Sequence, residues 1–432
     1  MRVADPARPV TPTTSPAPPL AVAPSPVPPS LSARAWQRFR AWPTWVQVLV
    51  AYAASRVLCG VVIELAARWA QNPAGVGALH PHYADLVGIW DGEWYQRIAE
   101  HGYPSRLPHG PVGAVDYNGW AFFPLFPMLV RAVMVTGLPF WLAASVVNLL
   151  AGAAAALVMW RLFAAVPGHR RLAALAVAIW CLLPPAPVLQ VAYTEALAAL
   201  LLAGSLLLLV RRQYLWAAPV VLLLGLTRAV AAPLVVIVVW HGVRRWRRRS
   251  RDPVTTRDRW SWTALLAVTA VSAVLWPAIV GVATGVPRAF FLTQAAWGQR
   301  PADGPFVPWL TWAWQGLGLA GVGLLLGVVA AGLHVLLGRH TAWLTPDLRA
   351  FGVVYPLYLL AVVRPITSMW RFLLLDLPIA AALASAAARG ARPRVSPHWR
   401  GRLALALLLG LAALTWWTFV YLTRVPWSDS PP

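Results

Sequence analysis

The stretch VPWLTWAWQGLGLAGVGLLLGVVAAGLHVL, residues 307–336, contains no aspartate, glutamate, lysine or arginine. A helix needs about 20 apolar residues to cross the hydrocarbon core of a bilayer, and this stretch is longer than that. Similar apolar stretches recur along most of the chain. Of its 432 residues, 59% are hydrophobic and only 12% are charged, whereas soluble domains carry about 25% charged residues. The sequence therefore predicts one membrane-embedded domain rather than several soluble ones.

The apolar stretches predict a polytopic, all-α transmembrane protein of about eleven membrane-spanning helices. Residues Phe122 to Gly137 leave a choice, because they either cross the membrane or lie in its interface as a short helix. We interpret them as interfacial, with Arg131 reaching the headgroups, so that the basic turn 161–171 stays cytoplasmic. The predicted spans are then 45–70, 138–162, 172–189, 192–210, 214–227, 229–243, 260–283, 307–336, 349–364, 367–388 and 403–423.

The first residues differ in composition from the rest of the chain. Residues 1–30 contain ten prolines among small and polar residues, and such a segment buries too little apolar surface to become ordered. Residues 1–40 are therefore predicted to form a disordered cytoplasmic tail. Residues 41–425 form the transmembrane domain, in which an outer loop, 71–137, carries the most informative motif, and 426–432 form a short second tail.

The distribution of charge argues against nucleic acid as a partner, although the formal net charge is +22. The chain has no lysine, and its 36 basic residues are arginines that cluster in short loops such as 244–259 and 389–402. Basic loops remain cytoplasmic, whereas the acidic loop 71–119 belongs on the outer face. The absence of lysine, with frequent Ala, Leu, Pro and Trp, indicates a GC-rich bacterial genome and hence the bacterial plasma membrane. Two cysteines in apolar stretches, Cys59 and Cys181, exclude a disulfide framework.

The outer loop contains the segment WDGEWYQRIAEHGYP, residues 90–104. Read as a helix, it places Trp90, Trp94 and Ile98 on one apolar stripe, and Gly102 predicts its end. One interpretation is an amphipathic surface helix in which Asp91 lies at the favourable N-terminus. The other is a carboxylate held at the membrane surface to deprotonate a hydroxyl group, flanked by aromatic rings that stack on sugars.

Metal ligands are poorly represented in this loop. Asp91 and Glu93 could hold a divalent cation, but side chains two positions apart on a helix diverge. The loop histidines fit no metal-binding spacing; they are His80, His82, His101 and His109. We therefore expect no metal or other cofactor, with a divalent cation as the alternative.

Several segments, in chain order, resemble the PIG-V family, which includes the second mannosyltransferase of glycosylphosphatidylinositol anchor assembly and its bacterial relatives. The most specific matches are Trp90 to Tyr103 and the run WAFFPLFP, residues 120–127. Weaker matches follow at 183–187 with Ala192-Tyr193-Thr194-Glu195-Ala196-Leu197, at Leu226-Thr227-Arg228, and at Thr367-Ser368-Met369-Trp370-Arg371-Phe372. Together they cover roughly residues 40–425. The chain departs from the family where Ala229-Val230 follow Arg228 in place of Asn-Gly, and where Trp94-Tyr95 replace His-Phe.

The resemblance implies a glycosyltransferase of the GT-C superfamily. Such an enzyme moves a hexose, here mannose, from a polyprenyl-phosphate sugar to an acceptor on the outer face, with inversion and without a metal. In this family an acidic residue of the first outer loop acts as general base, and this residue maps onto Asp91. Because bacteria normally make no such anchors, the implied acceptor is another glycolipid or a cell-envelope glycan.

The remaining candidate residues are predicted to bind the substrates or surrounding membrane lipids. Arg228, Arg364 and Arg371 could clamp the lipid phosphate, and we expect Arg371 to contribute more than Arg364. Their alternative role is to reach lipid headgroups, and Glu195 either belongs to the site or caps a helix at the surface. The full set of predicted substrate-binding residues is Trp90, Glu93, Trp94, His101, Tyr103, Glu195, Arg228, Arg364 and Arg371.

Three other functions remain open from the sequence. One is a lipid-carrier-dependent transferase of another sugar. Another is a transporter or flippase of lipid-linked sugars, although no internal repeat supports it and the polar residues gather toward one face. The third is a non-catalytic assembly partner, which would tolerate the loss of Asp91.

Overall fold

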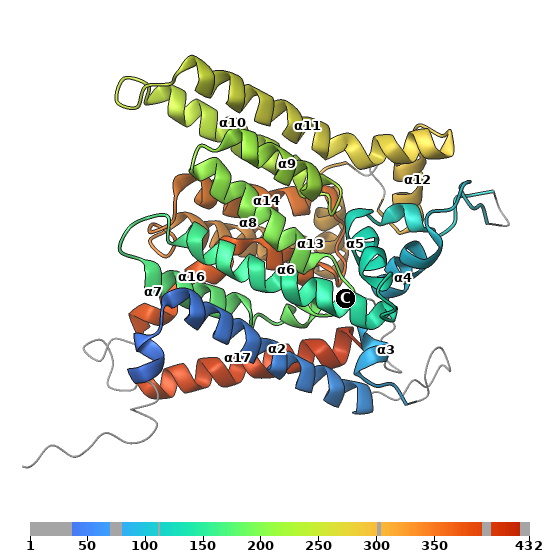
Figure 1. Ribbon diagram of the computed structural model, residues 1–432, viewed down its shortest axis with the longest axis horizontal. Coiled ribbons are helices and arrows are strands. Elements are labelled where there is room, and N and C mark those ends of the chain that lie inside the picture. Colours follow the sequence, from blue (N-terminus) through green and yellow to red (C-terminus); the bar gives the residue numbers. More distant parts are fainter. Residues whose placement is uncertain (1–36, 70–79, 111–112, 300–303, 391–398, 424–432) are drawn as a thin grey trace, which may run out of the picture. The chain divides into compact units, whose positions relative to one another are not determined.

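The computed structural model describes residues 37–69, 80–110, 113–299, 304–390 and 399–423 (Figure 1). The chain divides into two units at Trp42, and every element discussed below belongs to the second unit, residues 43–432. Of the predicted tail 1–40, all but the last four residues lies outside the described ranges, and so does the predicted tail 426–432. The predicted division into domains stays a prediction.

The described residues form helices and no strand, apart from one isolated bridge between His109 and Val115, which confirms the predicted all-α class. The helices are α2 (Thr44–Trp69), α3 (Tyr83–Val87), α4 (Asp91–His101), η1 (Gly119–Ala121), α5 (Leu125–Met134), α6 (Phe140–Phe163), α7 (Arg170–Trp180), η2 (Ala186–Leu189), α8 (Glu195–Val210), α9 (Tyr214–Gly225), α10 (Ala231–Arg247), α11 (Thr256–Thr284), α12 (Ala289–Ala296), α13 (Val307–Leu337), α14 (Pro346–Val362), α15 (Met369–Phe372), η4 (Leu373–Leu375), α16 (Leu377–Gly390) and α17 (Trp399–Tyr421).

Five helices are long and apolar enough to cross a membrane: α2, α6, α11, α13 and the part of α17 from Ala404 to Tyr421. A bent pair, Met369–Leu375 with Leu377–Ala388, would make a sixth if it counts as one span. The count of about eleven spans therefore stays a prediction. Helix α5 has 10 residues and is about 15 Å long, so it is too short to cross a bilayer, as the interfacial interpretation of residues 122–137 requires.

The helices alternate in direction between two ends of the second unit. At one end, the Leu125 amide donates to the Leu226 carbonyl (2.9 Å), and the Tyr358 hydroxyl donates to the Ala229 carbonyl (3.0 Å). The opposite end, which we call the arginine end, consists of the turns 164–169, 211–213, 248–255 and 338–345. There the ring of His169 stacks on that of Trp343, with 5.6 Å between centroids. Arg161, Arg170 and Arg171 flank the first of these turns, as predicted.

The predicted span 172–189 is wrong as a continuous helix, because α7 ends at Trp180 and a largely irregular segment, 181–194, which contains only the short η2, follows. Three prolines of this segment, Pro184, Pro185 and Pro187, cannot donate backbone hydrogen bonds. Irregular backbone within a membrane is tolerated where the protein buries it and satisfies its polar groups. Arg56 of α2 does so by donating to the carbonyls of Cys181 and Ala186, both at 2.7 Å.

Helix α6 supports the end of the same irregular segment. Its Asn148 side chain donates to the carbonyl of Tyr193 (2.9 Å) and to that of Val191. A second break lies within the predicted span 367–388, where the chain bends by 79° between η4 and α16; Pro378, the second residue of α16, cannot continue the hydrogen bonding of a straight helix. The two breaks lie beside each other, because the Trp180 ring nitrogen donates to the Leu374 carbonyl at 3.0 Å.

Candidate functional site

Helix α4 confirms the helix predicted from residue 90 onward. It begins at Asp91 and stops at Gly102, whose φ of +81° favours glycine. The residue before it, Trp90, has φ 60° and ψ −114°, a backbone conformation that costs a non-glycine residue about 1–3 kcal/mol. Gly92 permits close packing, because a Cβ there would lie 3.2 Å from the Val87 carbonyl oxygen and 3.4 Å from Ala192 Cβ. The start of α4 is thereby held against the segment that leads into α8.

Four charged side chains meet at this contact, and we call them the quartet: Asp91, Glu195, Arg228 and Arg371. Arg371 donates from one nitrogen to Asp91 Oδ2 (2.5 Å) and from another to Glu195 Oε1 (3.1 Å). Arg228 donates to the same Glu195 oxygen at 2.8 Å. Two carboxylates and two guanidinium groups thus form a chain of alternating charge whose formal sum is zero.

Burial differs along this chain of charges. The exposed fraction of the side chain is 0% for Glu195, 7% for Arg371, 14% for Arg228 and 17% for Asp91. Glu195 Oε2 is buried and finds no hydrogen-bond partner within the described part of the chain. A buried charge is tolerated when it is paired and hydrogen-bonded. Of the four groups, Asp91 is therefore the one most accessible to a substrate.

Aromatic rings and hydroxyl groups surround the two arginines. The guanidinium of Arg371 lies 4.9 Å from the ring centroid of Tyr193, and that of Arg228 lies 4.4 Å from the ring centroid of Phe372. Arg228 also donates to the Thr194 hydroxyl at 2.9 Å. Burial, together with the negative charge of Asp91, raises the pKa of the Tyr95 phenol well above its ordinary value, so this hydroxyl remains protonated beside the quartet.

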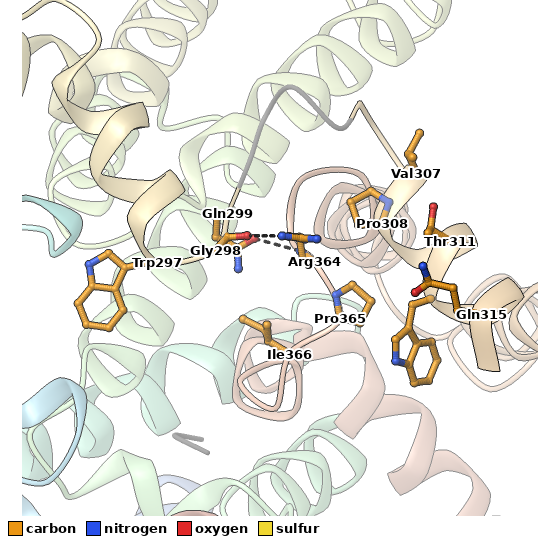
Figure 2. Close-up of a pocket in the computed structure, with 11 residues that line it drawn as sticks. Trp297, Gly298, Gln299, Val307, Pro308, Thr311, Gln315, Arg364, Pro365 and Ile366 are labelled. Atoms are coloured by element: carbon orange, nitrogen blue, oxygen red, sulfur yellow. Dashed lines mark hydrogen bonds between the residues drawn. The ribbon is translucent and has the colours of Figure 1, made fainter. Parts of the chain in front are cut away.

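A cavity of about 650 Å³ contains the third predicted arginine, Arg364, apart from the quartet (Figure 2). The Arg364 guanidinium donates to the Gly298 carbonyl (2.9 Å), and its backbone amide donates to Gln299 Oε1 (3.0 Å). Helix α13 forms one wall and kinks at Leu317 and Gly318, just beyond the cavity. The lining combines apolar and polar side chains: Trp297, Gly298, Gln299, Val307, Pro308, Thr311, Trp312, Gln315, Arg364, Pro365 and Ile366.

A second, more open pocket of about 510 Å³ lies along α4. It contains three of the predicted substrate-binding residues, Trp94, His101 and Tyr103. Trp94 is covered by the guanidinium of Arg97, 4.7 Å from its ring centroid, and His101 is exposed. The Tyr103 hydroxyl donates to the Phe122 carbonyl at 2.9 Å. Tyr103 is therefore tied to the protein, whereas His101 faces solvent.

Trp297 separates the two pockets. It lines the larger cavity, and its ring packs edge-on against Trp94 of the second pocket, with 5.4 Å between centroids. Phe122 and Tyr117 also pack edge-on against it, at 5.4 and 4.8 Å. Trp297 directly follows α12 and thereby brings this helix into contact with α4.

The structure thus brings Asp91, Glu195, Arg228 and Arg371 together and places Arg364 in a neighbouring cavity. Glu93 and Trp90 are half-buried, on α4 and directly before it; Glu93 lies about 200° around the helix from Asp91. Within the described ranges, no three His, Cys, Asp or Glu side chains are grouped as metal ligands.

Sequence reasoning missed residues that support the quartet. Tyr193 and Thr194 lie inside a matched motif, directly before Glu195. Only this place in the motif could have identified them as residues of the site. For Arg56 the sequence contains a stronger indication, because an arginine within an apolar span needs buried partners.

No family model and no curated protein matches this chain. Among solved structures, the crystal structure of the Archaeoglobus fulgidus oligosaccharyltransferase is similar, with 13% sequence identity and a TM-score of 0.43. The similarity covers 85% of this chain and 52% of the oligosaccharyltransferase, so the chain spans about half the length of that protein.

Proposed function

We propose that this protein is a membrane glycosyltransferase of the GT-C type. It transfers a hexose, mannose in the first instance, from a polyprenyl-phosphate sugar to a hydroxyl group of a glycolipid or cell-envelope glycan. The quartet end faces outward from a bacterial plasma membrane. The proposal rests chiefly on one observation: four motifs contribute the side chains of one buried quartet, although Asp91 and Arg371 are 280 positions apart.

In this proposal Asp91 is the general base. The acceptor hydroxyl oxygen attacks the anomeric carbon of the donor while its proton passes to the Asp91 carboxylate. The bond between that carbon and the phosphate oxygen breaks, and its electron pair leaves with the polyprenyl phosphate. Attack opposite the leaving group inverts the anomeric configuration. The accessibility of Asp91, the greatest in the quartet, fits this role.

Arg371 receives a different role from the one expected from the sequence. Two of its nitrogens already donate to Asp91 and Glu195, so binding a phosphate would require breaking buried ion pairs. We assign it to positioning, because it fixes the direction of the Asp91 carboxylate. Arg228 then holds Glu195 from the other side.

The larger cavity is the proposed donor site. It offers the Arg364 guanidinium for a phosphate, and amide and hydroxyl groups of Gln299, Gln315 and Thr311 for its oxygens. The apolar helix α13 forms its wall, and within that helix only Ala313, Gly321 and Leu336 are buried. An isoprenoid tail can therefore lie along α13 without displacing packed side chains.

Helix α8, which joins the quartet to the arginine end, does not support the alternative function as a transporter. Helix α8 runs from Glu195 at the quartet to the arginine end, and the side chains that it buries between them are mainly alanine and leucine. A polar headgroup passing along it would cross apolar packing, which is costly. A transferase that works at one end is compatible with this arrangement.

Transfer by the purified protein is the direct test. The protein in detergent or vesicles is given polyprenyl-phosphate mannose labelled in the sugar, with glycolipid extracts as acceptors, beside the corresponding glucose, galactose and arabinose donors. We expect labelled product from the mannose donor and at least a hundredfold slower transfer by the Asp91→Asn variant, about the contribution of a general base. Transfer from another sugar alone would correct the donor, and equal transfer by the variant would refute the catalytic role of Asp91.

A further inference from the structure

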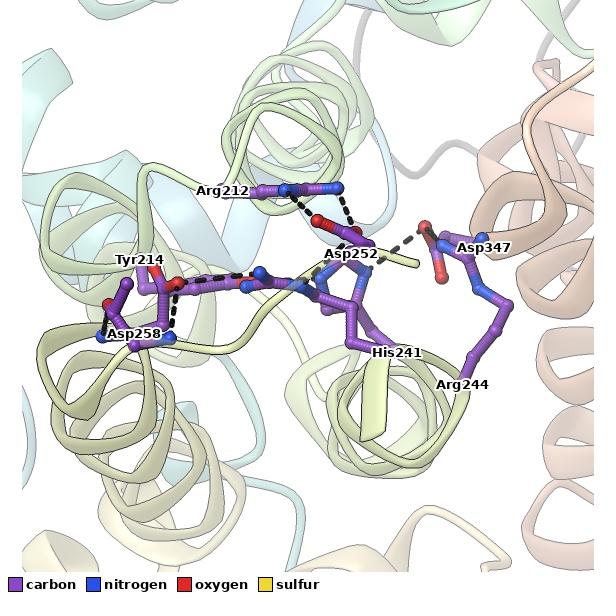
Figure 3. Close-up of polar contacts among 9 residues, drawn as sticks. Arg212, Tyr214, His241, Arg244, Asp252, Asp258 and Asp347 are labelled. Carbon is purple, nitrogen blue, oxygen red and sulfur yellow. Dashed lines mark hydrogen bonds and ion pairs between the residues drawn. The ribbon is translucent and has the colours of Figure 1, made fainter. Parts of the chain in front are cut away.

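The arginine end carries a second set of ion pairs, about 24 Å from the quartet along the 16 residues of α8 (Figure 3). Asp347, at the start of α14, accepts from Arg244 (2.6 Å) and pairs with His241 (3.1 Å). Arg212, in the turn after α8, donates to both oxygens of Asp252. These contacts tie the hairpin between α10 and α11 to the neighbouring turns.

The hairpin is also closed within itself. Arg245 at the end of α10 pairs with Asp258 at the start of α11 (3.4 Å) and donates to the Tyr214 hydroxyl (2.9 Å). Thr255 and Asp258 form a capping box that fixes the first turn of α11. The described carboxylates of this end, Asp252, Asp258 and Asp347, are therefore all paired with Arg212, Arg245 and Arg244, in that order.

Outside this framework the hairpin presents a surplus of positive charge. Its exposed arginines are Arg247, Arg248, Arg249, Arg251, Arg257 and Arg259. Trp246 and Trp260 flank the turn at the ends of the two helices and are 50% and 73% exposed. Tryptophan beside arginine at the end of an apolar helix is typical of the headgroup layer of a membrane.

We infer that this hairpin is a binding surface for anionic phospholipid headgroups. Guanidinium groups bind phosphate oxygens in pairs, and all six arginines lie within four residues of the end of α10 or the start of α11, a level that the ion pairs of this end hold. The two exposed tryptophans place that level at the lipid interface, which favours a lipid phosphate over a nucleic acid. The surface is remote from the quartet, so the inference does not depend on the proposed reaction.

Lipid selectivity of the reconstituted protein tests the inference. The full chain is placed in phosphatidylcholine vesicles with trace spin-labelled phosphatidylglycerol or spin-labelled phosphatidylcholine, and the immobilised fraction of each probe is measured by electron paramagnetic resonance. One arginine near an anionic lipid raises affinity roughly fivefold. We expect a several-fold preference for phosphatidylglycerol, and its loss when Arg248, Arg251 and Arg257 are replaced by glutamine.

A matched variant tests whether the lipid preference depends on the hairpin itself or only on the net charge of the protein. Replacing Arg161, Arg170 and Arg171 by glutamine removes the same charge from another turn of the same end, and it should leave the preference intact. Equal loss in both variants would overturn the inference, and so would no preference in the unaltered protein. Suppression by inorganic phosphate but not by chloride of equal ionic strength would point to a small-anion site instead. Stronger binding to a fluorescent DNA duplex than to phosphatidylglycerol vesicles would reassign the surface to nucleic acid.

Discussion

The two ends of α8 use the same residue types in opposite arrangements. At its start, Glu195 joins Asp91, Arg228 and Arg371 in a buried quartet whose formal charges cancel. Beyond its end, Arg212 pairs with Asp252 at the surface, and neighbouring arginines exceed the carboxylates. The two contacts of Arg371 span 176 and 280 positions, whereas the contact of His241 with Asp347 at the arginine end spans 106.

The two arrangements of charge differ because surface charges are hydrated and buried charges are not. A charge at the surface keeps its hydration, so unbalanced arginines are tolerated there and can meet the charges of lipids. A charge without water needs a partner, and removing one partner of a buried pair is expensive. The quartet is therefore a balanced unit in which Asp91 retains limited access, and changes there should have far larger effects than changes at the exposed pair Arg212–Asp252 of the arginine end.

The largest effect is expected at Asp91, the most accessible member of the quartet. Asp91→Asn keeps the shape and a hydrogen-bond acceptor for Arg371 but removes the base, so the transfer rate should fall by about 10²- to 10⁴-fold. Initial rates with saturating donor measure this. Glu93→Gln, on another side of α4, should cost far less; the reverse ranking would identify Glu93 as the base.

The balance of charge within the quartet can be broken and restored. Glu195→Gln leaves two guanidinium groups facing one carboxylate and should reduce the free energy of unfolding by about 3–5 kcal/mol. Adding Arg228→Gln returns the remaining pair to neutrality, so the double variant should be more stable than Glu195→Gln alone. Thermal unfolding in detergent compares the variants. Strictly additive losses would show that the two residues are not coupled.

Substitution of Arg56, which binds the backbone of the segment leading to Glu195, should reduce stability nearly as much. Arg56→Ala removes two charge-assisted hydrogen bonds to the carbonyls of Cys181 and Ala186, each worth about 1.5–3 kcal/mol. We expect the free energy of unfolding to fall by about 3 kcal/mol or more. Thermal unfolding measures this change. Arg68→Ala, which removes an exposed arginine from the same helix, is the control and should change stability little.

The donor cavity should respond in affinity rather than in stability. Arg364→Ala should raise the KM for the polyprenyl-phosphate donor by roughly ten- to a hundredfold, because one charged hydrogen bond to phosphate is lost. At saturating donor kcat should change little, unlike the result for Arg371→Ala, which disorients Asp91. Arg131→Ala, an exposed arginine of α5, serves as control. An unchanged KM for Arg364→Ala would exclude this cavity as the phosphate site.

Local patterns in the sequence were sufficient for the all-α class and for the bounds of α4. Gly102 indicated where α4 ends, and the alternation of spans placed Asp91, Glu195, Arg228 and Arg371 on one side. The breaks were harder to predict, because hydropathy is equally high in helix and in buried irregular backbone. Prolines 184, 185 and 187 marked the first break, but the arginine that stabilises it lies in another helix.

Pairing within the site could not be predicted from one sequence. Arg371 contacts Asp91 across 280 positions, and spacing says nothing about contacts at such separation. An arginine in a polar position could equally face a ligand phosphate or a carboxylate, and only the fold decides between them. For the same reason Arg364 and Arg371, seven positions apart, were treated as one clamp, although the bend near Pro365 and the short helix α15 direct them to different sites.

The smallest effect on the free energy of unfolding is expected at the surface ion pair of the arginine end. Arg212 and Asp252 form a two-pronged contact, but 47% and 33% of their side chains are exposed. Exposed pairs contribute about 0.2–1 kcal/mol because water and salt screen them. Arg212→Gln should therefore lower the free energy of unfolding by no more than that, and raising the salt concentration should erase the difference. Thermal unfolding of Arg212→Gln beside Arg228→Gln measures both pairs in one experiment. A loss at Arg212 as large as that at Arg228 would mean that burial does not set the strength of these contacts, and the contrast between the two ends would fail.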